Sequence, residues 1–600
     1  MNSELELLRR YEPIVRYTQG EMFFPCPVEP YIERCSLWRR VPDGPPEQLV
    51  PAGELTREKL VAYALECEAP LFLRFVQAPL SGIEYERWRK SRPPFQGSGR
   101  LARVGLLPRF IDSMFQLSLY LRGKVPGGTT GRAELQYRDI RQENPAVPYY
   151  GRVVRSDGYI VLQYHFFYAM NDWRSSFYGV NDHEADLEQV LIYLDDEEGR
   201  EPRPIWFACA AHDYSGDDLR RRWDDPELTI IDGHPVVYAG AGSHAAYFRP
   251  GEYLTSVEIK FLRPVAKAIH AGRRVWRDVL GQGDPTAAVR AAEALVRVPF
   301  VDYARGDGVS VGPGQVLEWS PVVIGDDTDW VHAYRGLWGL DTEDVFAGEL
   351  APAGPKYTRE GTVRHTWYDP IGWAGLGKVA PPSRTPAAIE ERLRELAAEL
   401  EKTQSTARSL TAELRGLDAQ MIALSSDGSV RQPVGELRSE IARREAELNT
   451  LRARESELER SIIEMKRSLE AVDNGDLGSP RAHIHRSMEP EPPGAARRSR
   501  LAELWAALSV GLLLLTGAAL VTFTDTDTLA SIGVLIAAAV FVDSILRGTL
   551  RTLLLNTTVV LAVITGAILI YEFAWQLALA GVAVIGVIIL AQNLRKLRSR

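Results

Sequence analysis

Four apolar segments follow one another closely at the C-terminal end of the chain, and they constrain most strongly what it can fold into. They are residues 504–523, 529–546, 552–571 and 573–591. Each has about 20 residues, the length that an α-helix needs to cross the hydrocarbon core of a bilayer, and none contains Lys or Arg. The alternative is a soluble helix bundle, but four such segments in under 100 residues, with almost no polar face, do not suit contact with water. We therefore expect four transmembrane helices within residues 504–591, in an integral, multi-pass membrane protein.

Basic residues flank these segments on alternate sides. Arg residues precede the first segment and border the second loop, and Arg and Lys lie in the tail 592–600, whereas the first loop, 524–528, has neither. Because Lys and Arg remain mainly on the cytosolic side, both termini and residues 1–500 are expected in the cytoplasm. The start MNSELELLRRYEP lacks the apolar stretch of a signal peptide. Asp543, inside the second segment, indicates either a proton or ion path or a position at the membrane interface.

Residues 386–472 repeat apolar side chains at the alternating spacing of four and three that is typical of a coiled coil. In the first half the repeated positions are Ile389, Leu393, Leu396, Leu400, Thr403, Ala407, Leu410, Leu414, Leu417, Met421 and Leu424. Gly and Pro residues within 425–435 interrupt the pattern. The two halves have nearly equal lengths, which favours an antiparallel hairpin; a parallel dimer of two separate coils is the alternative. The stalk would bind a protein partner or a second copy of the chain.

The segment after the stalk, residues 473–500, is rich in Pro, Gly and charged residues. This composition is typical of a flexible linker.

Composition is that of a folded, several-domain protein, with 45% hydrophobic and 25% charged residues among 600. The net charge of −9 gives no reason to expect nucleic-acid binding. The four cysteines lack CxxC spacing and are expected to be reduced thiols: Cys26, Cys35, Cys67 and Cys209.

Residues 1–380 contain short β-rich runs bounded by Gly, Pro, Asn and Asp, as strands are. The clearest runs are 159–170, 188–196, 203–212 and 234–242, and residues 58–68 and 265–298 show a helical pattern. The prediction is a mainly β protein with a β-sandwich-like cytosolic domain carrying helical insertions, followed by the helical stalk and the membrane region.

Several segments of this domain, in order, resemble the vacuolar protein sorting-associated protein 62 family, which is itself distantly similar to the necrosis- and ethylene-inducing peptide family. The resemblance spans residues 11–373 and is carried by YEPIVRYTQGEMFFPCPVEPYI (11–32), LQYHFFYAMND (162–172), HEADLEQV (183–190), HPVVYAGAGSHAAYF (234–248), YRGLWG (334–339), GP (354–355) and HTWYDPIGW (365–373). In the third segment, Ala185 and Leu187 stand where the family signature has Gly and Trp.

The resemblance implies a β-sandwich and, by analogy with the necrosis-inducing proteins, a His-x-x-Asp-x-Glu motif that binds a divalent cation. His183, Asp186 and Glu188 match that motif. The toxin-type relatives act outside cells on lipid headgroups, an activity that the expected cytosolic location argues against.

The same residues could form a cation site on chemical grounds alone, without the family resemblance. Asp186 and Glu188 lie two apart on an expected strand and so share a face, and His183 at the preceding turn can swing toward them. Two carboxylates and an imidazole suit Mg²⁺, Ca²⁺ or Mn²⁺, with Asp172 as a further oxygen ligand. The alternative is a solvated acidic strand end. Glu184 is expected to be exposed on the opposite face.

A second cluster surrounds Gly242, Ser243 and His244 in the segment GSHAAYF. Glycine there allows close backbone approach, and His244 is a candidate metal ligand or general base; a hydrogen-bonded core histidine is the alternative. His212 and Asp213, at the end of another strand, are candidates for the same pocket. The sequence contains no Gly-x-Ser-x-Gly, phosphate-cradling or HExxH motif.

Three functions follow as hypotheses. The first is a membrane-anchored cytosolic binding or tethering protein with a pocket organised by a divalent cation. The second is a metal-dependent hydrolase in which the cation activates water and His244 or His212 moves the proton. The third is a small pore or transporter gated by the cytosolic domain.

Overall fold

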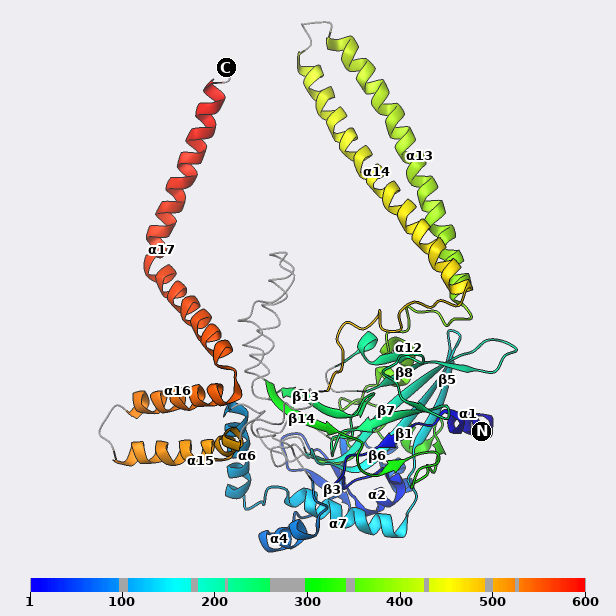
Figure 1. Cartoon of the computed structure of the whole chain (residues 1–600), viewed down its shortest axis with the longest axis vertical. Helices are drawn as coiled ribbons and strands as arrows, with labels where there is room; N and C mark the ends of the chain where they lie inside the picture. The colour runs from blue at the N-terminus through cyan, green and yellow to red at the C-terminus, as the bar shows by residue number, and fades with distance from the viewer. Residues whose placement is uncertain are drawn as a thin grey trace.

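The computed structural model describes residues 2–95, 106–173, 182–210, 214–258, 297–340, 351–425, 431–490, 500–523 and 528–598. Helix makes up 49% of the chain and strand 18%, in several separate sheets. The fold is therefore mixed α/β, and the expectation of a mainly β protein is met only in part. The long helices of the C-terminal half outweigh the sheets of the N-terminal domain (Figure 1).

A six-stranded sheet forms the centre of the N-terminal domain. Its strands, in order across the sheet, are β16 (Val322–Val323), β5 (Tyr150–Ser156), β6 (Tyr159–Asn171), β7 (His183–Asp195), β8 (Arg203–Cys209) and β9 (Arg220–Arg222). Neighbours are antiparallel except for the β16–β5 pair. The turn between β5 and β6 is Asp157–Gly158, with φ of 51° and 82°. An Asp-Gly turn with two positive φ angles matches the twist of the flanking strands and fixes the register of the hairpin.

A second sheet packs against one face of the central sheet. It consists of β10 (Ile230–Ile231), β11 (His234–Ala239), β1 (Ile14–Arg16) and β15 (Ser310–Val311), with β12 (Ala246–Tyr247) also paired to β11. One apolar core joins the two sheets, and it contains Ile14 and Val236 from the second sheet and Leu162 and Ile192 from the central one. The alternating inward side chains of the long strands β6 and β7 thus supply much of this core.

The opposite face of the central sheet is covered by a small sheet and several helices. These elements are β3 (Glu47–Val50), β2 (Ser36–Arg39), β4 (Leu71–Arg74), α2 (Val28–Arg34), α3 (Arg57–Glu66), α4 (Gly82–Ser91), α7 (Gly128–Glu143) and α10 (Asp329–Ala333). Phe167 of β6 packs there with Tyr31, Leu73, Tyr137 and Trp330. The remaining elements of the domain are α1 (Asn2–Tyr11), the 3₁₀ helix Gly216–Asp218, the hairpin β13 (Gly251–Glu258) and β14 (Arg297–Ala304), α11 (His365–Tyr368) and α12 (Pro370–Trp373).

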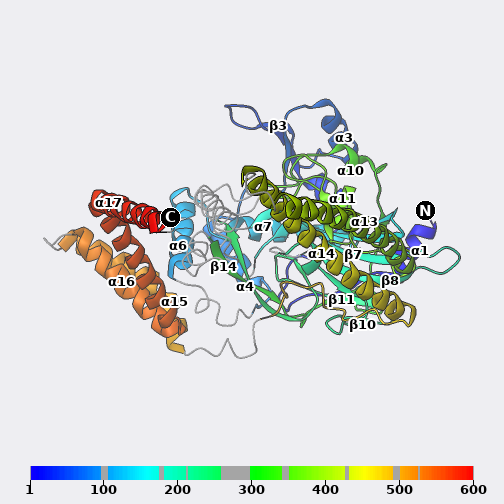
Figure 2. The ribbon, with the colours of Figure 1, turned by 90° about the horizontal axis from the view of Figure 1, so that it is seen from above.

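The stalk consists of two long helices that lie side by side, α13 (Thr385–Ser425) and α14 (Arg431–Asp473) (Figures 1 and 2). Their cross-contacts run in opposite directions along the two helices, since Arg454 pairs with Glu399 at 2.7 Å and Arg444 with Glu413 at 3.2 Å. The helices are therefore antiparallel. The buried positions between them belong to the coiled-coil repeat: Leu396, Thr403, Ala407, Leu410, Leu448 and Leu458.

The segment after the stalk, expected to be a flexible linker, lies against the N-terminal domain where the structure describes it. Arg222 of β9 donates hydrogen bonds to the carbonyls of Leu477 and Gly478 at 2.8 and 2.9 Å. The ring of His483 contacts Trp206, and Met488 is buried in the core between the two main sheets. Residues 491–499 lie outside the described residues.

Three apolar helices end the chain: α15 (Arg500–Phe523), α16 (Thr528–Arg547) and α17 (Leu550–Arg598). Of the four expected spans, the first two are confirmed as helices long and apolar enough to cross a membrane, Leu504–Phe523 and Leu529–Arg547. The third and fourth expected spans form one helix with a bend at Phe573, where φ and ψ depart from helical values. Within it, Leu579–Arg595 is a shorter apolar helical stretch. The helix α6 (Leu106–Leu121), from the N-terminal domain, contacts both α15 and α16 (Figure 1).

Candidate functional site

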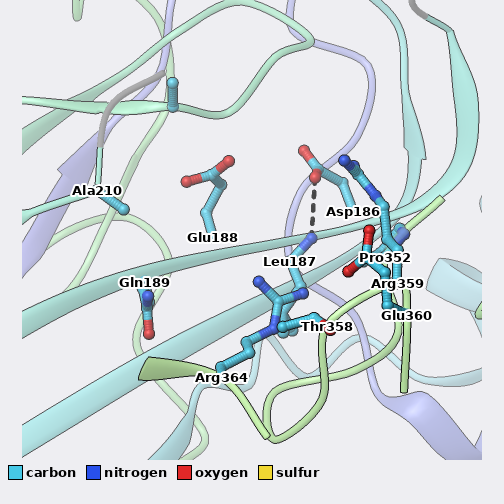
Figure 3. Close-up of a pocket in the computed structure, with 11 residues that line it drawn as sticks. Asp186, Leu187, Glu188, Gln189, Ala210, Pro352, Thr358, Arg359, Glu360 and Arg364 are labelled. Carbon is cyan, nitrogen blue, oxygen red and sulfur yellow. Dashed lines mark hydrogen bonds between the residues drawn. The ribbon is translucent and has the colours of Figure 1, made fainter. Parts of the chain in front are cut away.

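The candidate site lies at the start of β7, where the backbone departs from regular strand geometry. Ala185 has a φ of 55°, a left-handed conformation that a residue with a Cβ rarely adopts. Beyond it, Asp186 and Glu188 lie opposite Tyr168 and Phe166 of β6. Figure 3 shows both carboxylates on the same side of β7. The expectation that these two side chains share a face is therefore met.

Asp186 and Glu188 line a polar pocket of about 370 Å³ (Figure 3). The other residues that line it are Leu187, Gln189, Ala210, Ala245, Pro352, Thr358, Arg359, Glu360 and Arg364. They come from β7, from the ends of β8 and β12, and from the loop before α11. Carboxylates and guanidinium groups thus face one another across one cavity, which suits a ligand with both donors and acceptors.

Arg364 provides positive charge in this pocket. Its Nε–H donates to the carbonyl of Tyr357 at 2.7 Å. Burial lowers the pKa of Arg364 to about 10, with Arg359 adding to the decrease, while Glu188 and Asp186 oppose it. A group with that pKa remains charged at neutral pH. The pocket therefore holds carboxylates together with their own counter-charges.

His244 lies directly behind the pocket, buried, with a left-handed φ of 55°. Its Nδ1–H donates to Asp186 Oδ2 at 2.8 Å, and its ring stacks on Tyr168 with 3.7 Å between centroids. Its Nε2 faces Glu21 Oε1 at 3.8 Å. Burial lowers the pKa of His244, but the hydrogen bond with Asp186 and the proximity of Glu21 outweigh it and raise the pKa to about 9. At neutral pH the ring is an imidazolium held between two carboxylates.

Glu21 is a member of this site that sequence reasoning missed. Its Oε1 accepts hydrogen bonds from the backbone of Met22 and Phe23, and its Oε2 accepts one from Gly242 N at 2.8 Å. This carboxylate therefore ties the loop after β1 to the Gly242 turn and closes the far side of His244. In the sequence, Glu21 is the one charged residue in the otherwise apolar stretch 20–28. That pattern does not show that His244 and Gly242 are its partners.

Gly242 and Ser243 shape the turn rather than line the pocket. Gly242 has a φ of 72°, and Ser243 Oγ donates to Asp302, 2.8 Å from each carboxylate oxygen. Tyr247 donates its hydroxyl to the same carboxylate at 2.8 Å. Ser243 is fully buried in this network. Asp302, a second residue that the sequence pattern did not indicate, anchors the segment that positions His244.

The expected metal ligands are not assembled among the described residues. His183 is buried, with Nδ1 at 2.7 Å from the carbonyl oxygen of Ala185 on its own strand, and it does not line the pocket. Asp172 does not line the pocket either, and its backbone N–H donates to Gly242 O at 2.9 Å. Within the part of the chain that the structure describes, no three His, Cys, Asp or Glu residues are grouped to hold a metal ion.

Glu184 points away from Asp186, as expected, but the expectation that it is exposed was wrong. It is buried rather than exposed, and its carboxylate accepts hydrogen bonds from three backbone groups: Phe75 N at 2.8 Å, Val76 N at 2.9 Å and Leu340 N at 3.1 Å. The left-handed Ala185 sends Glu184 and Asp186 toward opposite sides of the strand. Glu184 therefore joins β7 to the segment after β4 and to residue 340.

His212 and Asp213, expected near the same pocket, lie outside the described residues. Comparison with family models, with curated proteins and with solved structures found no match for this chain.

Proposed function

We propose that the chain is a membrane-anchored cytosolic binding and tethering protein, in which the N-terminal domain binds a polar ligand and the stalk reaches a protein partner. The observation that carries this proposal is the mounting of the stalk. Before α13, Ser383 N donates to Asp195 Oδ2 at 3.1 Å, and after α14 Arg222 holds Leu477 and Gly478. The two helices of the arm have 41 and 43 residues, roughly 60 Å at 1.5 Å per residue, and both are attached to the domain at the base of the arm.

In this proposal α17 crosses the membrane twice, so that together with α15 and α16 the chain makes four passes. The bend at Phe573 in α17 would become the turn between the third and fourth spans, beside the charged Glu572. The distribution of Arg and Lys supports a cytosolic position for both termini. The N-terminal domain and the stalk would then share the cytosol.

Binding is favoured over hydrolysis by the state of His244. A general base must be unprotonated near neutral pH, whereas His244, with a pKa of about 9, is a cation facing Asp186 and Glu21. Ser243 is likewise committed to Asp302. These residues support a pocket that holds a ligand in place by charge and hydrogen bonds.

Site-specific photo-crosslinking tests the tethering function. Ile422, near the end of α13, is a large apolar side chain that is 64% exposed. With a photo-reactive amino acid at Ile422 in cells, we expect a discrete adduct with another protein. The matched control is Glu445, an exposed position on α14, where the adduct should be absent or weaker. If positions along both helices yield only adducts with a second copy of the chain, the stalk is a self-association device and the tethering proposal fails.

A divalent cation in the pocket stays a prediction, now limited to Asp186 and Glu188, the two expected ligands that line it. A cation that binds only the folded state raises stability by about 2.7 kcal/mol at a hundredfold excess over its dissociation constant. We expect the melting temperature of the full chain to be higher with Mg²⁺, Ca²⁺ or Mn²⁺ than with chelator. Glu188→Gln should abolish this difference and His183→Gln should preserve it. Equal melting temperatures with cation and chelator would remove the metal from the proposal.

A further inference from the structure

The helix α6 leaves the N-terminal domain and crosses the α15–α16 pair (Figures 1 and 2). Leu106 at its start is buried together with Val510 of α15 and Ala539 of α16. Trp505, Leu513 and Val540 pack around them as partly buried neighbours. An element of the cytosolic domain thus shares an apolar core with the two helices that are long and apolar enough to span a membrane.

A buried ion pair lies beside this core. Arg109 of α6 and Asp543 of α16 form a salt bridge, with side chains 3% and 6% exposed. Arg109 Nη1 also donates to Ser509 Oγ of α15 at 3.0 Å, and Arg547 lies 3.4 Å from Asp543. A carboxylate inside an apolar helix is costly unless it is paired. Asp543 is therefore neutralised by α6, which argues against an ion path and places α6 at the end of the hairpin where Arg500 and Arg547 lie.

Beyond this contact α6 continues with an apolar surface that the described residues leave uncovered. Phe110, Leu117 and Leu121 are 38%, 47% and 80% exposed, and their spacing of seven and four places them on one face of the helix. Tyr120 is 61% exposed beside them. Residues 113–121 carry no charge, and Arg122 and Lys124 follow immediately.

This surface continues onto the neighbouring helices. Leu508 and Leu512 of α15 and Phe541 and Ile545 of α16 are each between 47% and 49% exposed. Extended exposed apolar surface marks a contact with a membrane or a protein. If α15 and α16 span a bilayer, lipid acyl chains surround them. Because α6 packs against both helices, its uncovered face contacts the same acyl chains.

We propose that α6 is an interfacial helix that lies in the cytosolic leaflet of the bilayer crossed by α15 and α16, with Phe110, Leu117 and Leu121 among the acyl chains. Arg122 and Lys124 extend to the headgroup phosphates, and Tyr120 lies at the same level, as aromatic and basic residues do at the boundary between lipid and water. The inference rests on the proposed membrane anchoring. It adds a second attachment that holds the N-terminal domain against the lipid surface.

Spin-label accessibility tests this placement in the full chain reconstituted into vesicles of phosphatidylcholine and phosphatidylserine. Cys67, the one partly exposed native thiol, is replaced by Ser, since the other three cysteines are buried. Single labels are then placed at Leu117 and at Leu121. Leu515 of α15, 72% exposed, serves as the lipid control, and Ile83 of α4, 71% exposed, serves as the water control.

Oxygen concentrates in hydrocarbon, and a neutral nickel chelate stays in water. We expect the ratio of oxygen to nickel collisions at Leu117 and Leu121 to exceed that at Ile83 several-fold and to approach that at Leu515. Water-like ratios at both α6 positions, with a lipid-like Leu515, would overturn the proposal and leave the anchoring intact. A water-like Leu515 would overturn the anchoring itself. Low collision rates with both reagents, accompanied by spin–spin broadening, would show that a second copy covers α6 and would also overturn it.

Discussion

Replacing Glu184 with Ala should destabilise the N-terminal domain by about 4 kcal/mol, because each buried donor left without an acceptor costs roughly 1–3 kcal/mol. The backbone N–H groups of Phe75, Val76 and Leu340 all donate to this one carboxylate. For a domain of this size, such a loss lowers the melting temperature by roughly 10 °C. Thermal unfolding of the full chain, followed by tryptophan fluorescence, measures the effect.

The matched control is Glu33→Ala, which removes an exposed carboxylate from α2 and should change the melting temperature by no more than about 1 °C. Glu184→Gln retains one acceptor oxygen but turns an amide N–H₂ toward a backbone donor, so we expect an intermediate loss. If Glu184→Ala melts like Glu33→Ala, the three backbone groups have other acceptors and the role assigned to Glu184 is wrong.

Stability conferred by His244 should disappear as the pH rises. The pKa of His244 in the folded chain, about 9, lies above its ordinary value near 6.5. A raised pKa means that the folded state holds the proton more tightly, so the stabilisation is complete below pH 6.5 and is lost between pH 6.5 and 9. Its full size is about 3 kcal/mol, since each tenfold change in proton affinity corresponds to roughly 1.4 kcal/mol.

His244→Asn isolates this contribution from other groups that titrate in the same range. Asn tolerates the left-handed backbone at this position and retains an N–H donor for Asp186, but it carries no charge. We expect the difference in unfolding free energy between the native chain and the variant to be about 3 kcal/mol larger at pH 6 than at pH 9.5, where only the packing and hydrogen bonds of the neutral ring remain. An equal difference at both pH values would show that His244 is neutral in the folded protein.

Regular elements with a strong periodic pattern were predictable from the sequence. The runs 159–170, 188–196, 203–212 and 234–242 correspond to β6, β7, β8 and β11, and the helix expected at 58–68 is α3. These runs are rich in apolar, β-branched and aromatic residues. β6 is buried along its whole length, because both faces of the central sheet are covered. The overall balance was misjudged as mainly β, although the stalk and apolar C-terminal helices that the sequence predicted already exceed the strands in total length.

The candidate site was predictable only as far as local geometry allowed. Asp186 and Glu188 share a face because they are two apart on a strand, and the structure places both on one pocket. The left-handed Ala185 could not be read from the sequence. Nor could the burial of Glu184, which lies on the expected face but is covered by the segment after β4 and by residue 340. Glu21 and Asp302 reach the site through contacts with residues 221 and 59 positions away, which no local pattern encodes. The contact of α6 with α15 and α16 is similarly remote in sequence.

The double mounting of the stalk has a mechanical consequence. A coiled coil joined by a single flexible hinge would sweep a hemisphere, and anything at its end would be diluted over that volume. The chain is held before α13 beside Asp195, at the end of β7, and after α14 by Arg222 of the edge strand β9, so swivelling of the arm would break these hydrogen bonds. A partner held at the end of the arm is therefore confined to a small solid angle. When two binding sites are linked, the geometry of the link determines the effective concentration of one partner at the second site. Here the direction of the arm would set that concentration.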